Sequence, residues 1–177
     1  TWLFMFNYES PDCNNNDGPT NQTVSGATLL ANSFASDFAL LELSEPIPPD
    51  YNVWFSGWDN ANTPVAICAC IHHPKGDIKK ISLNDDLLTE SSGGSGVPTS
   101  HWRIDGWDAG TTEGGSSGSP LYNQTGLIIG QLYGGNASCT KIDYDDFGKL
   151  SMSWAKGADS KARLKDWLDP DNTGVTS

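Results

Sequence analysis

The stretch TEGGSSGSPLY, from Thr112 to Tyr122, decides the fold because it admits two incompatible interpretations. It is either a flexible Gly/Ser linker between two domains or a loop that presents a nucleophilic serine. A linker separates two units that fold independently, whereas here Pro120 and Leu121 lead directly from Ser119 into an apolar hairpin. We therefore expect the far end of this stretch to be held in place.

The spacing of glycine and serine in this stretch matches two catalytic motifs. Residues Gly114 to Gly118 fit G-x-S-x-G, the nucleophile elbow of α/β-hydrolases, but that elbow leads into a helix and Pro120 leads into a β-type run. The alternative, G-x-S-G-x-P, uses Gly115 and Ser117. In acyl transfer the attacking hydroxyl lies beside two backbone N–H groups that receive the oxyanion. A glycine at 115 can turn its N–H into such a site, so the sequence favours the second motif.

Composition places the chain among single globular domains of the all-β class. It has 177 residues, of which 37% are hydrophobic and 18% charged, and this length is sufficient for one well-buried core. Nineteen glycines and ten prolines separate short apolar runs, a pattern typical of strands and tight turns. We expect strands in TWLFMFNY, NVWFSGWD, VAICACIHHP, IKKISL and HWRIDGWD, one hairpin formed by SGATLLANSF and SDFALLEL, and a second hairpin in SPLYNQTGLIIGQLYGG.

One helix is expected, near the C-terminal end. In ADSKARLKDWLDP, residues 158–170, Leu164, Trp167 and Leu168 lie on one helical face and Pro170 ends the pattern.

The formal net charge of −12 argues against nucleic acid and anionic membranes as partners, because both are bound through excess Lys and Arg. No apolar run reaches membrane-spanning length, and no signal peptide is recognisable. Because the chain opens on what resembles the middle of a strand, we expect further sequence upstream of Thr1.

Four cysteines are compatible with an oxidising compartment. Cys68 and Cys70 alternate on one predicted strand, so they face the same side and a bond between them would be strained. With His72 and His73 they suggest a metal site, but no second ligand pair follows at zinc-finger spacing. We favour a packed strand and expect neither a metal nor a cofactor.

Several segments together resemble the secreted trypsin-like serine endopeptidases of bacteria, and most of all the lysyl endopeptidase group. They are TEGGSSGSPLY, GLIIGQLYGG, SDFALLEL with a following GWD, and IHHPKGDIKKIS, which occur in the order of that family. The similarity runs from about residue 8 to about residue 174. It implies a trypsin-like double β-barrel with a C-terminal helix. Residues 1–49 would be the last strands of an incomplete first barrel, and residues 50–177 the second barrel.

The resemblance implies a secreted, monomeric enzyme that cleaves proteins or peptides after Lys or Arg, and it assigns catalytic roles. Ser117 matches the nucleophile, and the N–H groups of Gly115 and Ser117 match the oxyanion hole. Asp37 matches the triad aspartate; without the resemblance it would be interpreted as a turn residue before a strand.

The resemblance also implies a substrate-binding pocket. Tyr133 matches a residue beside the specificity pocket, and Gly134 and Gly135 match positions that keep its mouth open. Asp145 matches an acidic residue at the pocket base that pairs with a basic P1 side chain, the side chain before the scissile bond. The assignment to Asp145 can shift by a residue because two other aspartates crowd it, and the competing interpretation of Asp143, Asp145 and Asp146 is an exposed acidic turn.

The histidines depart from the family pattern. The family order is His, Asp, Ser, and no histidine precedes Asp37. The triad histidine therefore lies upstream of Thr1, or the protein is not a working enzyme. The pair at 72 and 73 would give the Asp, His, Ser order of subtilisin, whose parallel α/β units this sequence lacks. We expect HHP to form a surface turn and His101 to have no role.

Two further departures concern activation and disulfides. Ser116 replaces the aspartate with which animal trypsins bind a newly cut N-terminus, so that activation switch is not expected. Cys13 and Cys139 match family cysteines whose partners lie upstream, whereas Cys68 and Cys70 have no counterpart. Two other classes of function remain as alternatives: a catalytically dead homologue that acts as a binding module, and an unrelated β-domain that binds carbohydrate through exposed tryptophans.

Overall fold

The computed structural model describes residues 2–176 and consists mostly of antiparallel β-sheet, as predicted. Thr1, where the first predicted strand begins, and Ser177 lie outside the described residues. The strands are β1 (Leu3–Met5), β2 (Thr23–Ser25), β3 (Ala27–Ser33), β4 (Phe38–Leu43), β5 (Cys68–His72), β6 (Lys80–Asn84), β7 (Thr89–Ser91), β8 (His101–Ile104), β9 (Pro120–Asn123), β10 (Ile128–Gly135) and β11 (Asp145–Lys149). The helices are α1 (Leu150–Ala155) and α2 (Lys165–Leu168), with short 3-10 turns at Pro49–Tyr51 and Pro74–Gly76.

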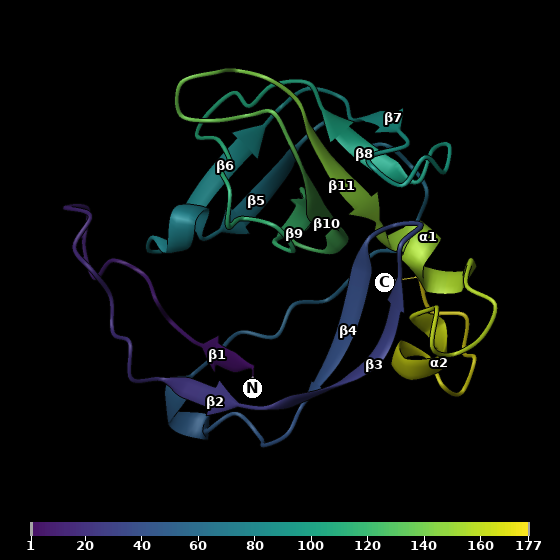
Figure 1. The fold of residues 1–177 in the computed structure, drawn as a ribbon, viewed down its shortest axis with the longest axis horizontal. Helices are drawn as coiled ribbons and strands as arrows, with labels where there is room; N and C mark the ends of the chain where they lie inside the picture. Colours follow the sequence, from purple (N-terminus) through teal and green to yellow (C-terminus); the bar gives the residue numbers. More distant parts are fainter. Residues whose placement is uncertain (1, 177) are drawn as a thin grey trace.

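The largest unit is a seven-stranded antiparallel sheet in the order β6-β5-β9-β10-β11-β8-β7, seen in the upper part of Figure 1. Alternate side chains of a strand point to the same face of a sheet. The apolar side chains that these strands turn inward pack into one hydrophobic core. In β5 this alternation buries Cys68, Cys70 and His72. The core contains Cys68, Cys70, Leu88, Trp102, Ile104, Trp107, Leu121, Ile129, Leu132 and Phe147.

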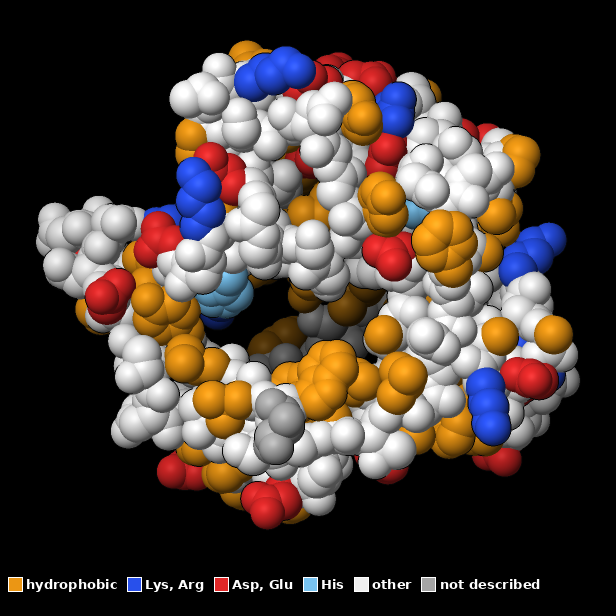
Figure 2. Space-filling view, viewed as in Figure 1, with side chains coloured by type: hydrophobic (Ala, Val, Ile, Leu, Met, Phe, Trp, Pro, Cys, Tyr) orange, Lys and Arg blue, Asp and Glu red, His pale blue; other side chains and the backbone are white. Residues whose placement is uncertain are grey.

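Two separate hairpins, β1-β2 and β3-β4, lie below this sheet in Figure 1. Hairpin β3-β4 packs against the C-terminal helices through a smaller core of Ala31, Phe38, Leu150 and Leu164. Neither hydrophobic core of the described residues includes a residue of hairpin β1-β2. Figure 2 shows a deep hollow between the two parts, with hydrophobic side chains along the rim formed by the β1-β2 region.

The C-terminal helix is present but much shorter than predicted. Residues 158–164 are irregular because their backbone groups bond elsewhere: the carbonyl of Lys161 accepts from Asn32 of β3, and the N–H of Leu164 donates to Ser153 of α1. Helix α1 and strands β2, β7 and β11 were not predicted. The strand predicted in NVWFSGWD is wrong, since only Trp58 forms an isolated bridge there, to Ile128.

All four cysteines lie among the described residues, and none is bonded to another. Cys13 and Cys139 are exposed, so a pairing with partners outside this chain stays a prediction. Burial raises the pKa of the Cys68 thiol to about 12, and Cys70 is also held protonated by burial. No described helix combines the length and the apolar character needed to cross a membrane.

Candidate active site

Residues 112–119 form a loop that is fixed to the seven-stranded sheet. The N–H of Gly118 donates to the carbonyl of Leu132 on β10 at 2.8 Å, and the N–H of Leu132 donates to the carbonyl of Ser119 at 2.8 Å. Ser117 is exposed on the turn before these bonds. The stretch therefore presents a serine from a fixed backbone and does not behave as a linker.

The backbone of this loop leaves two N–H groups free. The N–H of Ser116 donates to the carbonyl of Glu113 at 3.0 Å. Among the described residues, no hydrogen bond uses the N–H of Gly115 or of Ser117. Gly115 has a φ of +96°, where a side chain is strained, and a Cβ there would lie 3.0 Å from the backbone nitrogen of Lys75. The two N–H groups predicted to receive an oxyanion are thus available.

His72 is not part of the surface turn that the sequence predicts for HHP, because the turn there begins only at Pro74. His72 is only 1% exposed, and its Nδ1 lies 2.8 Å from the Oγ of buried Ser116. Its Nε2 lies 2.9 Å from the Oγ of Ser82. The prediction was wrong because His72 continues the alternation of Cys68 and Cys70 along β5, so it faces the core. The alternation is present in the sequence, so it could have predicted that His72 is buried.

Neither of the other two histidines bonds to Ser117 among residues 2–176. His73 has its Nδ1 beside the carbonyl of Asp77. His101 is fully buried, with its Nδ1 2.7 Å from the Oγ of Ser100 and its Nε2 without a partner among the described groups. The chain therefore provides no imidazole for Ser117 in this structure.

Asp37 lies on the turn between β3 and β4, directly before β4 begins. Its φ of 53° is left-handed, a conformation that aspartate adopts more readily than most residues. The side chain of Gln131 on β10 holds this turn, since its amide donates to the carbonyl of Ser36 at 2.6 Å and more weakly to that of Asp37 at 3.4 Å. Asp37 itself is exposed.

Strand β10 therefore holds both predicted catalytic segments through neighbouring residues. Gln131 binds the turn that carries Asp37, and the backbone of Leu132 binds the loop that carries Ser117. Asp37 and Gly118 also line one cavity of about 360 Å³. The remaining lining residues are Phe38, Ala39, Leu40, Ser56, Gly57, Trp58, Ile128, Gln131, Leu150, Leu164 and Leu168.

Tyr133 stands at an irregularity of β10. The register of β10 against β11 shifts between Leu132 and Gly134, which leaves Tyr133 outside the ladder and redirects its side chain. Its ring packs edge-on against buried His101, with ring centroids 5.5 Å apart. His101, for which the sequence suggested no role, thus supports a residue predicted to line the substrate pocket.

The two glycines after Tyr133 pair with the acidic strand β11. Gly134 lies opposite Asp146, and Gly135 lies opposite Asp145. A Cβ on Gly135 would come within 2.5 Å of Oδ1 of Asp145. Glycine at this position therefore allows β10 to approach the carboxylate of Asp145 closely.

The three aspartates of this region have different partners. Asp146 is paired by Arg103 in a two-pronged ion pair of 2.7 and 2.8 Å, and Asp143 is paired by Lys141. Asp145 is 1% exposed, so the exposed-turn interpretation fails for it.

No cation among the described residues pairs with Asp145. Its Oδ2 accepts from the indole N–H of Trp107 at 2.7 Å and from the hydroxyl of Thr112 at 2.6 Å. Burial raises the pKa of Asp145, and these two hydrogen bonds partly oppose the increase. A buried carboxylate without a cation is a group that a positively charged ligand would stabilise.

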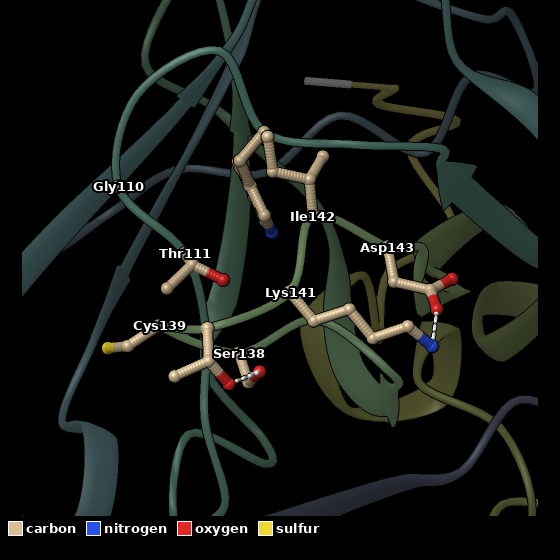
Figure 3. Close-up of a pocket in the computed structure, with 9 residues that line it drawn as sticks. Gly110, Thr111, Ser138, Cys139, Lys141, Ile142 and Asp143 are labelled. Atoms are coloured by element: carbon tan, nitrogen blue, oxygen red, sulfur yellow. Dashed lines mark hydrogen bonds and ion pairs between the residues drawn. The ribbon is translucent and has the colours of Figure 1, made fainter.

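A second cavity, of about 270 Å³, is shown in Figure 3. Lys141 reaches across to the carboxylate of Asp143, so that carboxylate is not free for a ligand (Figure 3). Trp107 lines this cavity and also donates to Asp145, so the cavity and Asp145 share a wall residue. Gly110, Thr111, Ser138, Cys139, Thr140 and Ile142 complete the lining.

Comparison with known proteins identifies the family of this chain. The sequence profile of the family described as lysyl endopeptidase, C-terminal domain, matches residues 1–148. The chain belongs to this family.

A lysyl endopeptidase of Pseudomonas aeruginosa is 35% identical over 144 residues, which are 75% of this chain and 29% of that protein. The chain thus spans less than a third of the length of this relative.

Solved structures of the Rv3671c protease of M. tuberculosis are more distant. The active form is 18% identical with a TM-score of 0.46, and the alignment covers 75% of this chain and 57% of that chain. An inactive form is 19% identical with a TM-score of 0.42, and the alignment covers 70% of this chain and 61% of that chain. Membership of the lysyl endopeptidase family removes the alternative of an unrelated carbohydrate-binding domain.

Proposed function

We propose that this chain is the nucleophile-bearing and substrate-binding part of a secreted serine endopeptidase that cleaves after Lys, or after Arg. The observation that carries the proposal is the loop at 115–117. It is fixed to β10, it exposes Ser117, and it leaves the N–H groups of Gly115 and Ser117 without partners among the described residues. This is the arrangement that acyl transfer needs.

These positions support the following reaction. The Oγ of Ser117 attacks the scissile carbonyl carbon and gives its proton to an imidazole that comes from outside this chain. The carbonyl oxygen becomes an oxyanion and accepts from the N–H groups of Gly115 and Ser117. The imidazole then protonates the leaving amine as the C–N bond breaks. Water hydrolyses the resulting ester of Ser117 by the same route.

Asp37 would orient that imidazole and stabilise its charged form. Its place supports this role, because β10 holds both the Asp37 turn and the Ser117 loop through the adjacent residues Gln131 and Leu132. The cavity lined by Asp37 and Gly118 is where an imidazole would enter.

Specificity for a basic P1 side chain rests on Asp145. It is buried and has only neutral hydrogen-bond donors, whereas Arg103 and Lys141 already pair with the neighbouring carboxylates. A point-like ammonium can approach a recessed carboxylate that a planar guanidinium is too wide to reach, so we favour Lys over Arg.

The test compares Asp145→Asn with Asp143→Asn in the full-length protein. We expect Asp145→Asn to lower kcat/KM for Lys and Arg esters by about a hundredfold or more. Asp143→Asn is the matched control and should retain most of the activity, because Lys141 already pairs with Asp143. Unchanged cleavage after Lys and Arg in Asp145→Asn would mean that other residues form the pocket.

A catalytically dead binding module is the second candidate, since no histidine of the described chain bonds to Ser117. Full-length protein that binds Lys-containing peptides but cleaves none would support it. Secretion, a monomeric state, peptide substrates without nucleic acid or membrane partners, and a boundary between residues 49 and 50 belong to the same proposal.

A further inference from the structure

The buried imidazole of His72 has a partner on each ring nitrogen. Ser116 Oγ lies 2.8 Å from Nδ1, and Ser82 Oγ lies 2.9 Å from Nε2. All three residues are at most 1% exposed, so water cannot replace either bond. The imidazole therefore connects strands β5 and β6 to the loop that carries Ser117.

The hydrogen-bond pattern indicates where the imidazole proton lies. The N–H of Glu113 donates to Ser116 Oγ at 3.4 Å, so Ser116 both accepts and donates if its own proton goes to His72 Nδ1. The ring proton then lies on Nε2 and is donated to Ser82. Burial lowers the pKa of His72, and the neighbouring His73 lowers it further, which keeps the ring neutral.

Ser116 stands between the two residues whose N–H groups are free. Its side chain points into the protein toward His72, while Gly115 and Ser117 on either side are exposed. The segment after His72 adds two contacts to the same loop: the N–H of Lys75 donates to the carbonyl of Gly114 at 2.7 Å, and its ammonium pairs with Glu113 at 2.9 Å.

We propose that His72 is a positioning residue for the oxyanion site: through Ser116 it fixes the backbone so that the N–H groups of Gly115 and Ser117 stay available. The inference rests on the proposed function. By the family resemblance, Ser116 stands where animal trypsins have the aspartate that binds a newly cut N-terminus, so its bond to His72 would hold this loop without a cleavage event.

Two substitutions of His72, by asparagine and by glutamine, each retain one of its two hydrogen bonds and remove the other. The amide of His72→Asn branches where the imidazole has Nδ1, so its oxygen can still accept from Ser116. The amide of His72→Gln extends to the position of Nε2, so it keeps Ser82 and loses Ser116. Ser116→Ala removes the same bond from the other side, and His73→Gln is the control for a neighbouring imidazole outside the bond.

In the full-length protein, His72→Gln and Ser116→Ala should lower kcat for a Lys ester by about 10- to 100-fold with little change in KM. This is less than the hundredfold to thousandfold loss expected when an oxyanion donor is removed outright. His72→Asn should recover most of kcat, and His73→Gln should match the parent. Equal losses in His72→Asn and His72→Gln, or a loss confined to KM, would overturn the proposal.

A measurement that needs no activity keeps this test separate from that of the proposed function. In ¹⁵N-detected NMR of this chain, His72 should be a neutral imidazole protonated on Nε2, and Ser116→Ala should shift its Nδ1 resonance. A His72 ring that titrates near the ordinary histidine pKa of about 6.5 and does not respond to Ser116→Ala would overturn the inference. If the full-length protein cleaves nothing while the NMR result holds, the proposed function fails and the His72 contact stands.

Discussion

The two regions that contribute the proposed catalytic groups are held in different ways. Asp145 lies in a seven-stranded sheet whose core has ten buried residues among those described, and Ser117 lies on a loop that is bonded to this sheet. Asp37 belongs to a two-stranded hairpin whose core has four buried residues, two of them contributed by the C-terminal segment. The sheet can therefore preorganise its part of the site, whereas the Asp37 turn depends on docking to β10 and on α1.

The largest expected effect is the loss of unfolding free energy when a core aromatic side chain is removed, and it should differ between the two hydrophobic cores. Phe147→Ala removes a fully buried ring from the sheet and should cost about 3–5 kcal/mol of unfolding free energy. Phe38 is 6% exposed in the smaller core, so Phe38→Ala should cost less and leave the sheet folded. Urea unfolding followed by tryptophan fluorescence measures both. A larger loss of unfolding free energy for Phe38→Ala than for Phe147→Ala would contradict the view that the sheet is the more stable of the two regions.

The next largest effect is a dependence of the unfolding free energy on pH, which comes from two buried histidines of the seven-stranded sheet. Burial lowers the pKa of both His72 and His101, so the unfolded chain takes up protons that the folded chain does not. Stability is therefore fully present above the unfolded histidine pKa of about 6.5 and is lost as the pH falls below it, by at most about 1.4 kcal/mol per pH unit for each imidazole.

The measurement is urea unfolding at pH 7.5 and at pH 5.5. Burial raises the pKa of Asp145, which acts in the opposite direction, so the comparison uses Asp145→Asn as the background. His101→Phe should reduce the pH dependence, and His73→Gln serves as the control. Stability that stays constant or increases toward pH 5.5 would contradict the buried neutral state of these histidines.

Removing the docking contact should affect the hairpin alone. Gln131→Leu loses the bonds to the carbonyls of Ser36 and Asp37, at an expected cost of about 1–2 kcal/mol. Hydrogen exchange should become faster in β3 and β4 and stay unchanged in β5 and β9. Faster exchange throughout the sheet would mean that the two regions unfold as one unit.

The smallest effect is expected at the exposed ion pair beside the Ser117 loop. Lys75 is 71% exposed in its pair with Glu113, so Glu113→Gln should change the unfolding free energy by no more than about 0.5 kcal/mol. The carbonyl of Glu113 still accepts from Ser116 in this variant. A loss above about 1 kcal/mol, measured by urea unfolding, would show that this pair contributes more than an exposed ion pair normally does.

The sequence predicted the elements whose pattern is local. The hairpins at β3-β4 and β9-β10 follow from apolar runs separated by turn residues, and both are confirmed. Strand β11 was missed because all five of its residues are buried, including two aspartates and a lysine, so it shows no alternation of polar and apolar residues. The long C-terminal helix was wrong because bonds to β3 and α1 replace its internal ones.

The candidate site residues were proposed from motifs, and the side chains that support them were missed because these depend on contacts between distant segments. Nothing in the sequence around Gln131 indicates that its amide reaches the Asp37 turn, 94 residues away along the chain. Trp107 and Thr112 meet Asp145 only through the packing of β11. His72 is different, since its alternation with Cys70 predicted burial and the HHP motif was interpreted as a turn instead.

The most direct test of the central claim, that Ser117 is an activated nucleophile, is covalent labelling. Full-length protein treated with a fluorophosphonate should carry one adduct, located on Ser117 by mass spectrometry, and Ser117→Ala should carry none. The neighbouring Ser116, buried and bonded to His72, should stay unmodified. An adduct on a different serine, or an unlabelled protein that still cleaves Lys esters, would contradict the account.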